Sequence, residues 1–405
     1  MGMSDPRIFY AGLVAASDAY RVLCVQNYAA SGTLFVQSLL DFHPQTLSLP
    51  GLALRDFPEQ WARIGQMPPA EQLPQFASVL DPLFVPDHWQ WVDWGTDKLG
   101  PSRDRGCHVD RAAFYAHFAA LIACGGGDTR RRFLCSVYVA FALTLGRSVP
   151  PRATLVFPIH GGPLFRAQTI ETDFPDALYL HMVRHPISAA VSVARHARAT
   201  FGAEPFPAVE RGLVQVLSDR AWSSDEPGYG DRAYLPEIGA RAKAFRLEAL
   251  HARPRETLAA ICAFAGLDWD DALLRSTVNG LQWWNRAESP RVSGFDPALP
   301  ARGVAERTHA IERLAIRLAA LPKLAAWRYS DAAPFARWPE WLIRLVFLAA
   351  ALVPFRAEFG RPDDAEAPPG RAWWRRYRGI RRALWRGYSD ARAAAPITVS
   401  SGEER

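Results

Sequence analysis

A buried strand that runs through a loop of small residues into a helix, near the N-terminus, is the feature that most constrains the fold. Residues 20–26 (YRVLCVQ) are mostly apolar, which predicts a buried strand. The small residues of 27–33 (NYAASGT) follow, and 34–40 have the apolar spacing of a helix that ends before Pro44. Backbone N–H groups converge in such a loop at the positive end of the helix dipole, so the unit predicts an anion site.

The rest of the chain alternates between predicted strands and helices. Further strands are expected over 154–159, 178–183 and 245–250. Helices are expected over 111–124, over 128–147, after Pro186 and over 255–265. Strands that alternate with helices predict an α/β fold, with a central parallel sheet flanked by helices on both faces.

The composition excludes several classes of protein. Of the 405 residues, 49% are hydrophobic and 22% are charged, so the chain is expected to be globular and neither disordered nor collagen-like. The longest apolar stretch, 341–355, is too short for a helix to cross a bilayer. The N-terminus shows no basic-then-apolar signal segment, so we expect a cytoplasmic location. An excess of arginine and alanine is typical of a GC-rich bacterial genome.

Cysteines and histidines are not spaced for metal binding. The five cysteines include no CxxC pair, and the ten histidines include no HExxH pair. Neither a disulfide framework nor a metal site is therefore expected.

The sequence divides into a large N-terminal part and a C-terminal extension. We expect residues 1–335 to form the α/β domain, with a lid or insert at about 56–105. An apolar helix over 336–359, a linker over 360–370 and a basic amphipathic helix with a tail over 371–405 are expected to follow.

The segment 371–388 (RAWWRRYRGIRRALWRGY) contains seven arginines, five aromatic residues and no acid. Helical spacing places five of its apolar residues on one face: Trp373, Tyr377, Ile380, Leu384 and Tyr388. A helix of this kind suits an anionic membrane surface, so peripheral contact with the inner membrane face is expected. Packing on the body of the protein and contact between copies are the alternatives, and the oligomeric state is left open. Because no nucleic-acid recognition module is visible, no nucleic acid partner is expected.

The loop after the first strand lacks the signatures of common nucleotide folds. Ser31 and Thr33 add hydroxyl donors, and Gly32 lets a phosphate oxygen approach the backbone. The chain contains no Gly-Lys pair and no GxGxxG, which disfavours an ATP-using P-loop kinase and a dinucleotide fold. An ordinary helix start is the alternative interpretation of the loop.

A second group of residues follows the predicted strand 178–183. Arg184 ends that strand, Pro186 begins a helix, and Ser192 lies in its first two turns. An arginine fork with a hydroxyl so placed makes a second phosphate clamp. Two clamps at the carboxyl ends of neighbouring strands suit a ligand with phosphates at both ends of a nucleoside.

These residues resemble the sulfotransferase family, whose members transfer a sulfuryl group from 3′-phosphoadenosine 5′-phosphosulfate (PAPS). The resemblance rests on Ser31-Gly32-Thr33, on the spacing of Arg184, Pro186 and Ser192, and on the segment 246–267. It implies a P-loop-NTPase-related fold, PAPS as co-substrate and no metal. It also implies that seven successive residues form the 5′-phosphosulfate loop: Ala29, Ala30, Ser31, Gly32, Thr33, Leu34 and Phe35.

The resemblance assigns further roles in nucleotide binding. It implies that Arg184 and Ser192 hold the 3′-phosphate. Arg291 and Arg302 lie in two loops that each resemble the late basic-glycine loop of the family, and the sequence does not choose between them. Phe35 matches the position where the family stacks an aromatic ring on adenine; core packing on an amphipathic helix is its alternative.

A hydroxyl acceptor must lose a proton as it attacks sulfur, so a base is required at a strand end. The resemblance implies that His160, which follows the predicted strand 154–159, is this general base. A capping or packing histidine is the alternative, and the competing bases are His108, Glu171 and Asp173.

One residue departs from the family pattern. The family loop carries Lys or Arg immediately before Ser-Gly, and here that position is Ala30. Three explanations are open. Another cation takes the place of the missing one, such as Lys98 or an arginine from elsewhere, or the backbone amides catalyse the reaction alone and slowly. In the third, the protein binds the nucleotide without turning it over.

The resemblance implies an enzyme that transfers sulfuryl from PAPS to a hydroxyl, and we expect a glycan or lipid-linked glycan as acceptor. The alternative from another class is a non-catalytic nucleotide-binding or membrane-associated scaffold with the same fold, which Ala30 motivates. A relative of the P-loop kinases is a third interpretation, disfavoured by the missing Gly-Lys pair.

Overall fold

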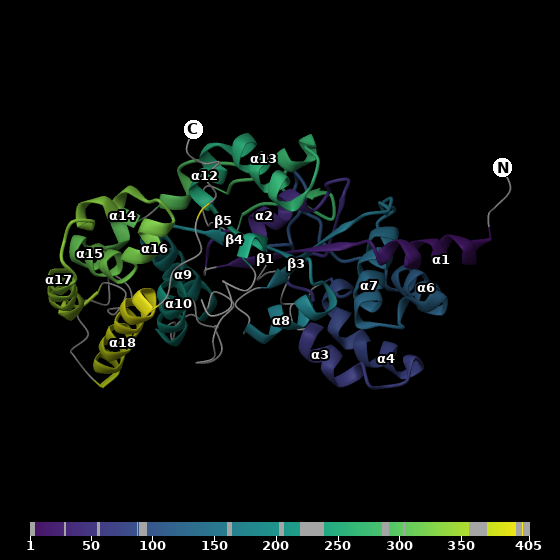
Figure 1. Ribbon diagram of the computed structural model, residues 1–405, viewed down its shortest axis with the longest axis horizontal. Coiled ribbons are helices and arrows are strands. Elements are labelled where there is room, and N and C mark those ends of the chain that lie inside the picture. Colours follow the sequence, from purple (N-terminus) through teal and green to yellow (C-terminus); the bar gives the residue numbers. More distant parts are fainter. Residues whose placement is uncertain are drawn as a thin grey trace.

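Five parallel strands form the central sheet of the protein, here as a computed structural model (Figure 1). The structure describes residues 5–27, 30–54, 57–86, 88, 95–159, 164–201, 206–218, 239–285, 291–302, 304–355, 371–393 and 399. The strands are β1 (Arg21–Asn27), β2 (Thr46–Ser48), β3 (Thr154–Ile159), β4 (Leu178–Val183) and β5 (Ala242–Arg246). A short antiparallel pair, β6 (Thr277–Val278) and β7 (Leu281–Gln282), lies outside this sheet.

The strand order β2-β3-β1-β4-β5 places β1 at the centre. From β1 the chain first builds β2 and β3 on one side and then crosses to β4 and β5 on the other side. The order therefore reverses at β1, and in open parallel sheets ligands bind at the carboxyl ends of the strands at such a point. Asn27 ends β1, and the loop predicted to bind an anion follows directly.

Helices cover both sides of the sheet, as Figure 1 shows for α12 and α13 on one side and α8 on the other. The α-helices are α1 (Pro6–Ser17), α2 (Thr33–Leu40), α3 (Phe57–Ile64), α4 (Pro69–Leu80), α6 (Arg111–Leu121), α7 (Arg130–Thr144), α8 (Leu164–Asp173), α9 (Pro186–Phe201), α10 (Phe206–Ser218), α12 (Leu247–Ala252), α13 (Pro254–Ala265), α14 (Val304–Arg307), α15 (Ala310–Ala319), α16 (Leu321–Ala326), α17 (Glu340–Leu352) and α18 (Arg371–Ala393). Shorter helical turns are η1 (Asp81–Leu83), η2 (Ile122–Gly126), η3 (Gly239–Arg241), η4 (Asp271–Leu274), η5 (Leu299–Ala301) and η6 (Ser330–Phe335).

The predicted strand over 245–250 is wrong in its bounds. The chain leaves the sheet after Arg246, and Leu247 begins α12. Glu248 explains the difference, because its carboxylate accepts from the backbone N–H of His185 (3.0 Å) and from the hydroxyl of Tyr329 (2.7 Å). These are tertiary contacts, which an apolar run in the sequence cannot indicate.

The main core lies around the sheet and extends into the segment expected to be a lid or insert. There, α3 and α4 pack through Phe57, Trp61 and Phe76 on Phe133 of α7, with ring centroids 4.8 to 6.4 Å apart. The described residues of this segment therefore include packed helices, although their sequence shows weak periodicity.

A second core joins the helices after β4 to the C-terminal helices. It contains buried side chains from five α-helices, among them Leu213 of α10, Ile316 of α15, Phe347 of α17 and Leu384 of α18. The residues expected to link α17 and α18, 360–370, lie outside the described residues. Beyond α18 the structure describes Val399, which is buried and pairs with Ala244 of β5.

The apolar face of α18 is a packing face. Ile380 and Leu384 are fully buried in the second core, and the Tyr377 hydroxyl donates to the carbonyl of Leu352 (2.8 Å). The interpretation of this face as the membrane-facing one is therefore corrected, because these side chains are already covered by α10, α15 and α17. Among the described residues, no helix is both long enough and apolar enough to cross a bilayer.

Candidate active site

The loop after β1 reaches α2 through two residues with positive φ. Ala30 has φ 49° and Gly32 has φ 87°, and Gly32 is the N-cap residue of α2. A Cβ at position 32 would lie 2.5 Å from Cδ1 of Leu247, so both the conformation and the close packing require glycine. Residues 28 and 29, and with them the predicted site residue Ala29, lie outside the described residues.

At the start of α2, donors lack partners among the described residues. Gly32 has no side chain to cap the first N–H groups of the helix. The hydroxyl of Thr33, the first residue of α2, is buried and has no hydrogen-bond partner among the described residues. Ser31 beside it is fully buried. An unpaired buried hydroxyl beside free helix N–H groups is the arrangement that a bound phosphate or sulfate oxygen would satisfy.

Arg184 joins the loop after β1 to the segment after β7. At the carboxyl end of β4, its Nη1 donates to the carbonyl of Ala30 (3.1 Å). Its Nε donates to the carbonyl of Pro300 in η5 (3.1 Å), and Nη2 donates to the same oxygen. The structure thus brings the two predicted phosphate clamps together at the central strand, with Arg184 as the bridge.

The charge of Arg184 is set by its surroundings. Burial lowers its pKa to about 10; the nearby carboxylate of Glu248 opposes this effect and the charge of Arg195 adds to it. At that pKa the guanidinium still carries its charge near neutrality. Arg195 is therefore a second cation close to the site, and Ser192, half-buried on α9, precedes it by three residues on the same side of the helix.

Phe35 lies in an aromatic cluster. Its ring is buried and stacks on His251 of α12, with centroids 4.7 Å apart and planes at 4°. Phe295 meets it edge-on at 5.5 Å, and Trp283 lies at 6.4 Å. Burial and the charge of Arg184 lower the pKa of His251 to about 4, so this ring is neutral near pH 7 and its Nδ1 accepts from the N–H of Asp296 (3.1 Å).

The two late loops differ in the contacts that their residues make. Arg302 follows Pro300, which Arg184 contacts, and its guanidinium pairs with Asp296 at 2.6 Å. Arg291 is exposed, and the neighbouring Val292 pairs with Asn285. The loop of Arg302 is therefore the one that the structure brings to Arg184.

The predicted base, His160, lies outside the described residues, directly after β3. Its carboxylate competitors sit in α8, which runs from the loop after β3 towards the start of β4. Glu171 pairs with Arg241 and Asp173 with Arg130. Both precede Leu178 by a few residues, so they lie towards the amino ends of the strands, away from the loop after β1. His108 is exposed in an irregular segment.

The three lysines leave one candidate for the missing loop cation. Lys323 is buried and donates to the carbonyl of Val216 (3.0 Å), and Lys243 lies near the amino end of β5 over the ring of Phe264. Lys98 is exposed in the segment before α6.

Two residues near the site, Arg195 and His251, were not predicted from the sequence. Arg195 lies three residues after Ser192, and His251 lies three residues after Glu248. This helical spacing is the signal that could have identified them.

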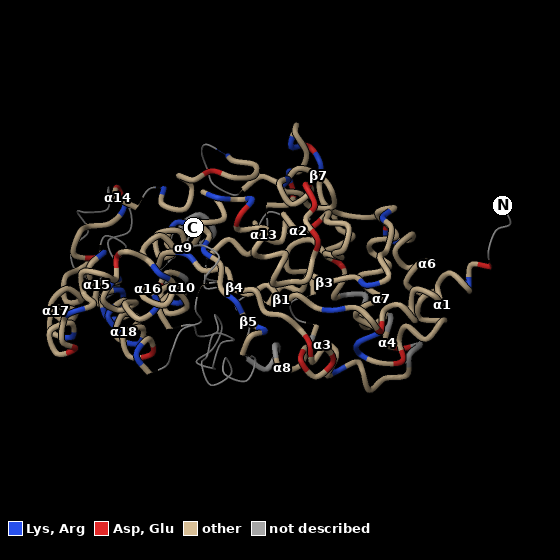
Figure 2. Tube along the Cα trace, turned by 45° about the horizontal axis from the view of Figure 1, so that its top comes forward, with Lys and Arg blue, Asp and Glu red and all other residues tan. Residues whose placement is uncertain are grey.

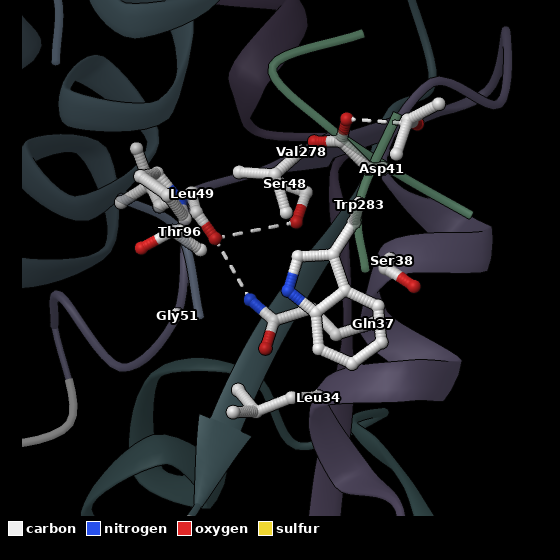
Figure 3. Close-up of a pocket in the computed structure, with 12 residues that line it drawn as sticks. Leu34, Gln37, Ser38, Asp41, Ser48, Leu49, Gly51, Thr96, Val278 and Trp283 are labelled. Carbon is white, nitrogen blue, oxygen red and sulfur yellow. Dashed lines mark hydrogen bonds between the residues drawn. The ribbon is translucent and has the colours of Figure 1, made fainter. Parts of the chain in front are cut away.

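A small pocket lies along α2, beyond the loop (Figure 3). Figure 3 shows the Gln37 amide pointing toward Leu49, whose carbonyl accepts from Nε2 at 2.7 Å, while Gln37 Oε1 is buried without a partner among the described residues. Asp41 lies at the far end of the pocket and accepts from the Thr277 hydroxyl (3.1 Å) and the Gly280 N–H (3.0 Å). Burial raises the pKa of Asp41 to about 6.

Comparisons with known proteins place the chain in a family. Among solved structures it is similar to the sulfotransferase domain from the curacin biosynthetic pathway, at 16% identity over 70% of this chain and 90% of that domain, with a TM-score of 0.39. It is also similar to the sulfotransferase domain from the Synechococcus PCC 7002 olefin synthase (16% identity, 70% of this chain, 86% of that domain, TM-score 0.34). Sulfotransferase STF9 from Mycobacterium avium is a third (16% identity, 64% of this chain, 67% of that one, TM-score 0.33).

No curated protein sequence matches the chain significantly. The model of the sulfotransferase family matches residues 29–271, which include the loop after β1, Arg184 and α12. This match covers more than half of the chain. The chain therefore belongs to the sulfotransferase family.

Proposed function

We propose that the protein transfers a sulfuryl group from PAPS to a hydroxyl group of an acceptor. The observation that carries the proposal is the Arg184 bridge, which holds the loop of Ala30 and the loop of Pro300 together at the central strand. Two anion-binding elements at this position suit a nucleotide with a 5′-phosphosulfate and a 3′-phosphate.

The residues around the bridge fit that nucleotide. The N–H groups at the start of α2 and the unpaired Thr33 hydroxyl suit the 5′-phosphosulfate. Arg184, with Ser192 and the loop of Arg302, is proposed to hold the 3′-phosphate. Phe35 is proposed to contact adenine; because one of its faces already stacks on His251, the base would approach from the edge or displace that ring.

Bound PAPS supplies the sulfuryl group, which passes to the acceptor oxygen while 3′-phosphoadenosine 5′-phosphate (PAP) leaves. The acceptor oxygen–sulfur bond forms as the bond from sulfur to the bridging phosphate oxygen breaks. We propose that His160 takes the acceptor proton and that the N–H groups of α2 stabilise the charge that develops on the leaving phosphate. Arg195 and Lys98 are the candidates for the cation that Ala30 does not supply.

Two nucleotide experiments test the proposal. Calorimetric titration with PAP, ATP and AMP should show a clear preference for PAP, and transfer of labelled sulfate from PAPS to a panel of glycans and lipid-linked glycans should show turnover. Preference for ATP would overturn the nucleotide assignment. Tight PAP binding with no transfer to any acceptor would favour the second candidate function, a non-catalytic nucleotide-binding protein, which Ala30 motivates.

The proposed base has its own test. His160→Ala should lower turnover by about 10² to 10⁴, the usual contribution of general acid–base catalysis, and leave PAP affinity nearly unchanged. The measurement is single-turnover transfer with titration of PAP alongside. Turnover equal to that of the unmodified protein would move the role to His108, since Glu171 and Asp173 are held in ion pairs.

A further inference from the structure

The outer face of α17 carries an exposed apolar stripe. Trp341, Leu345, Leu348 and Leu352 follow one another at helical spacing, and Trp341 and Leu352 are each 66% exposed. The opposite face of the same helix is buried in the second core through Ile343, Phe347, Ala350 and Ala351. The stripe is therefore separate from the face by which α17 packs on the second core.

Helix α18 lies beside α17 in the opposite direction. The Arg392 guanidinium pairs with Glu340 at the start of α17, and the hydroxyl of Tyr377 donates to Leu352 at its end. Figure 1 shows the two helices side by side at one end of the molecule. The exposed side chains of α18 include Trp374, Arg378, Arg382 and Trp385, at a spacing that again places them on one face.

The exposed face of α18 meets α17 at Trp385. Trp385 of α18 stacks on Phe347, and Arg344 of α17 lies over the Trp385 ring at 5.6 Å. By helical geometry, Arg344 lies about 70° and Phe347 about 130° around α17 from the middle of the stripe, so α18 flanks the stripe without covering it. Because α18 is antiparallel to α17 and packs on the same core, we infer that its exposed face continues the surface formed by the stripe. We name the surface formed by Trp341, Leu345, Leu348, Leu352, Trp374 and Trp385 the α17–α18 surface.

The rim of the α17–α18 surface carries more positive than negative charge. Arg344, Arg378 and Arg382 are exposed along it, and 371–388 contains no acidic residue. The acidic residues beside it are Glu340, which pairs with Arg392, and Glu210, which pairs with Arg382. Figure 2 shows blue segments gathered along α18 and its neighbours at this end of the molecule. Tryptophan and leucine ringed by arginine match the boundary between the acyl chains and the headgroups of an anionic bilayer.

We propose that the α17–α18 surface docks on an anionic membrane surface, with the leucine stripe and the tryptophans entering the headgroup boundary and the arginines meeting the lipid phosphates. A pair of helices with exposed apolar side chains fits a bilayer plane, whereas a peptide would need a groove. A second copy fits less well, because a two-fold pairing of this face would bring arginines against arginines. The proposal does not depend on the sulfotransferase activity.

The test uses the full chain and vesicles of two compositions, phosphatidylcholine alone and phosphatidylcholine mixed with phosphatidylglycerol. The unmodified protein should sediment with the mixed vesicles and much less with phosphatidylcholine alone, and added salt should weaken the binding. The double variant Leu345→Gln/Leu348→Gln and the double variant Arg378→Gln/Arg382→Gln should each bind the mixed vesicles at least about tenfold more weakly.

The matched control is Ile8→Gln/Phe9→Gln on α1, where two apolar residues with exposure similar to that of Leu345 and Leu348 lie outside the α17–α18 surface. This variant should bind as the unmodified protein does, and thermal unfolding of all variants should show that they are folded. Absence of binding to mixed vesicles, or equal binding by the leucine variant, overturns the proposal. Sedimentation velocity without lipid distinguishes self-association: a dimer that the leucine variant converts to a monomer would assign this face to a second copy instead.

Discussion

At the scale of single residues, Arg184 has an observed structural role and a proposed binding role. Its guanidinium donates to the carbonyl oxygens of Ala30 and Pro300 and so joins two loops that are far apart in the sequence. The same fork of donors suits a phosphate, since bidentate contacts need the planar geometry of arginine. An experiment on Arg184 therefore has to distinguish its effect on the position of the loops from its effect on binding of the 3′-phosphate.

Comparison of PAP with AMP makes that separation, because AMP lacks the 3′-phosphate. Arg184→Ala should lower the affinity for both nucleotides by releasing the loops, and should lower the affinity for PAP by at least about tenfold more, since a hydrogen bond to a charged group contributes about 1.5–3 kcal/mol. The affinities of Arg184→Lys should lie between those of Arg184→Ala and the unmodified protein, because an ammonium keeps the charge but lacks the planar fork that reaches both carbonyls. Calorimetric titration measures both affinities; equal losses for PAP and AMP would contradict the phosphate role.

Asp41 gives a pH dependence of folding stability. Its pKa is about 6 in the folded protein against 3.8 as the ordinary value. Between these two values the folded protein keeps the proton and the unfolded chain releases it, so this group makes the free energy of unfolding fall as the pH rises through the window. The ionised, buried carboxylate of Asp41 thus lowers the free energy of unfolding near neutral pH.

Asp41→Asn removes this titration and keeps an acceptor for Thr277 and Gly280. Relative to the unmodified protein, the variant should gain about 1–3 kcal/mol of unfolding free energy between about pH 4 and pH 7. Urea unfolding across this pH range measures the difference. A difference that stays constant with pH would show that Asp41 does not titrate in this range.

At the scale of elements, the start of α2 depends on one contact with α12. The two helices are separated by more than 200 residues in the sequence, and Gly32 touches Leu247. The aromatic stack of Phe35 on His251 joins the same two helices one turn further on. The loop that is proposed to bind the 5′-phosphosulfate is therefore shaped as much by α12 as by its own small residues.

Gly32→Ala should disturb this element. The added methyl group would meet Leu247 at 2.5 Å with φ at 87°, a conformation that costs about 1–3 kcal/mol for a residue other than glycine. Lower thermal stability and weaker PAP binding are expected. Gly12→Ala on α1 is the matched control, because its methyl group meets nothing within 4 Å and helix propensity favours it. Removing the clash with Leu247→Ala should restore part of the affinity and leave the backbone strain.

At the scale of the whole molecule, the second core links the C-terminal helices to the site. Helix α9, which carries Ser192, contributes Ile187 and Val193 to this core, and Ala30 packs against it. Helix α18 covers the same core through Ile380 and Leu384. The basic C-terminal segment is thus part of the folded body, and its arginines line the solvent side.

Leu384→Ala should lower the free energy of unfolding by about 2–5 kcal/mol, because it empties a fully buried position. Arg382→Ala, two residues away and exposed, should change it by less than about 0.5 kcal/mol. Urea unfolding followed by tryptophan fluorescence measures both changes. A normal stability for Leu384→Ala would show that α18 contributes little to the second core.

Much of the central sheet followed from local pattern. The apolar strands 20–26, 154–159 and 178–183, the loop of small residues and the proline after Arg184 are each determined by side chains close together in the chain, so the parallel α/β fold could be predicted and is confirmed. The position of Gly266 likewise marks the end of α13, where φ is 65°.

What only the tertiary structure decided depends on contacts between distant segments. The end of β5 and the start of α12 follow from the bonds of Glu248 to His185 and Tyr329. Which late loop meets Arg184 follows from Pro300, and the burial of the apolar face of α18 follows from the second core. An amphipathic pattern states that a helix has an apolar face; it does not state whether protein or membrane covers that face, because both remove the same side chains from water.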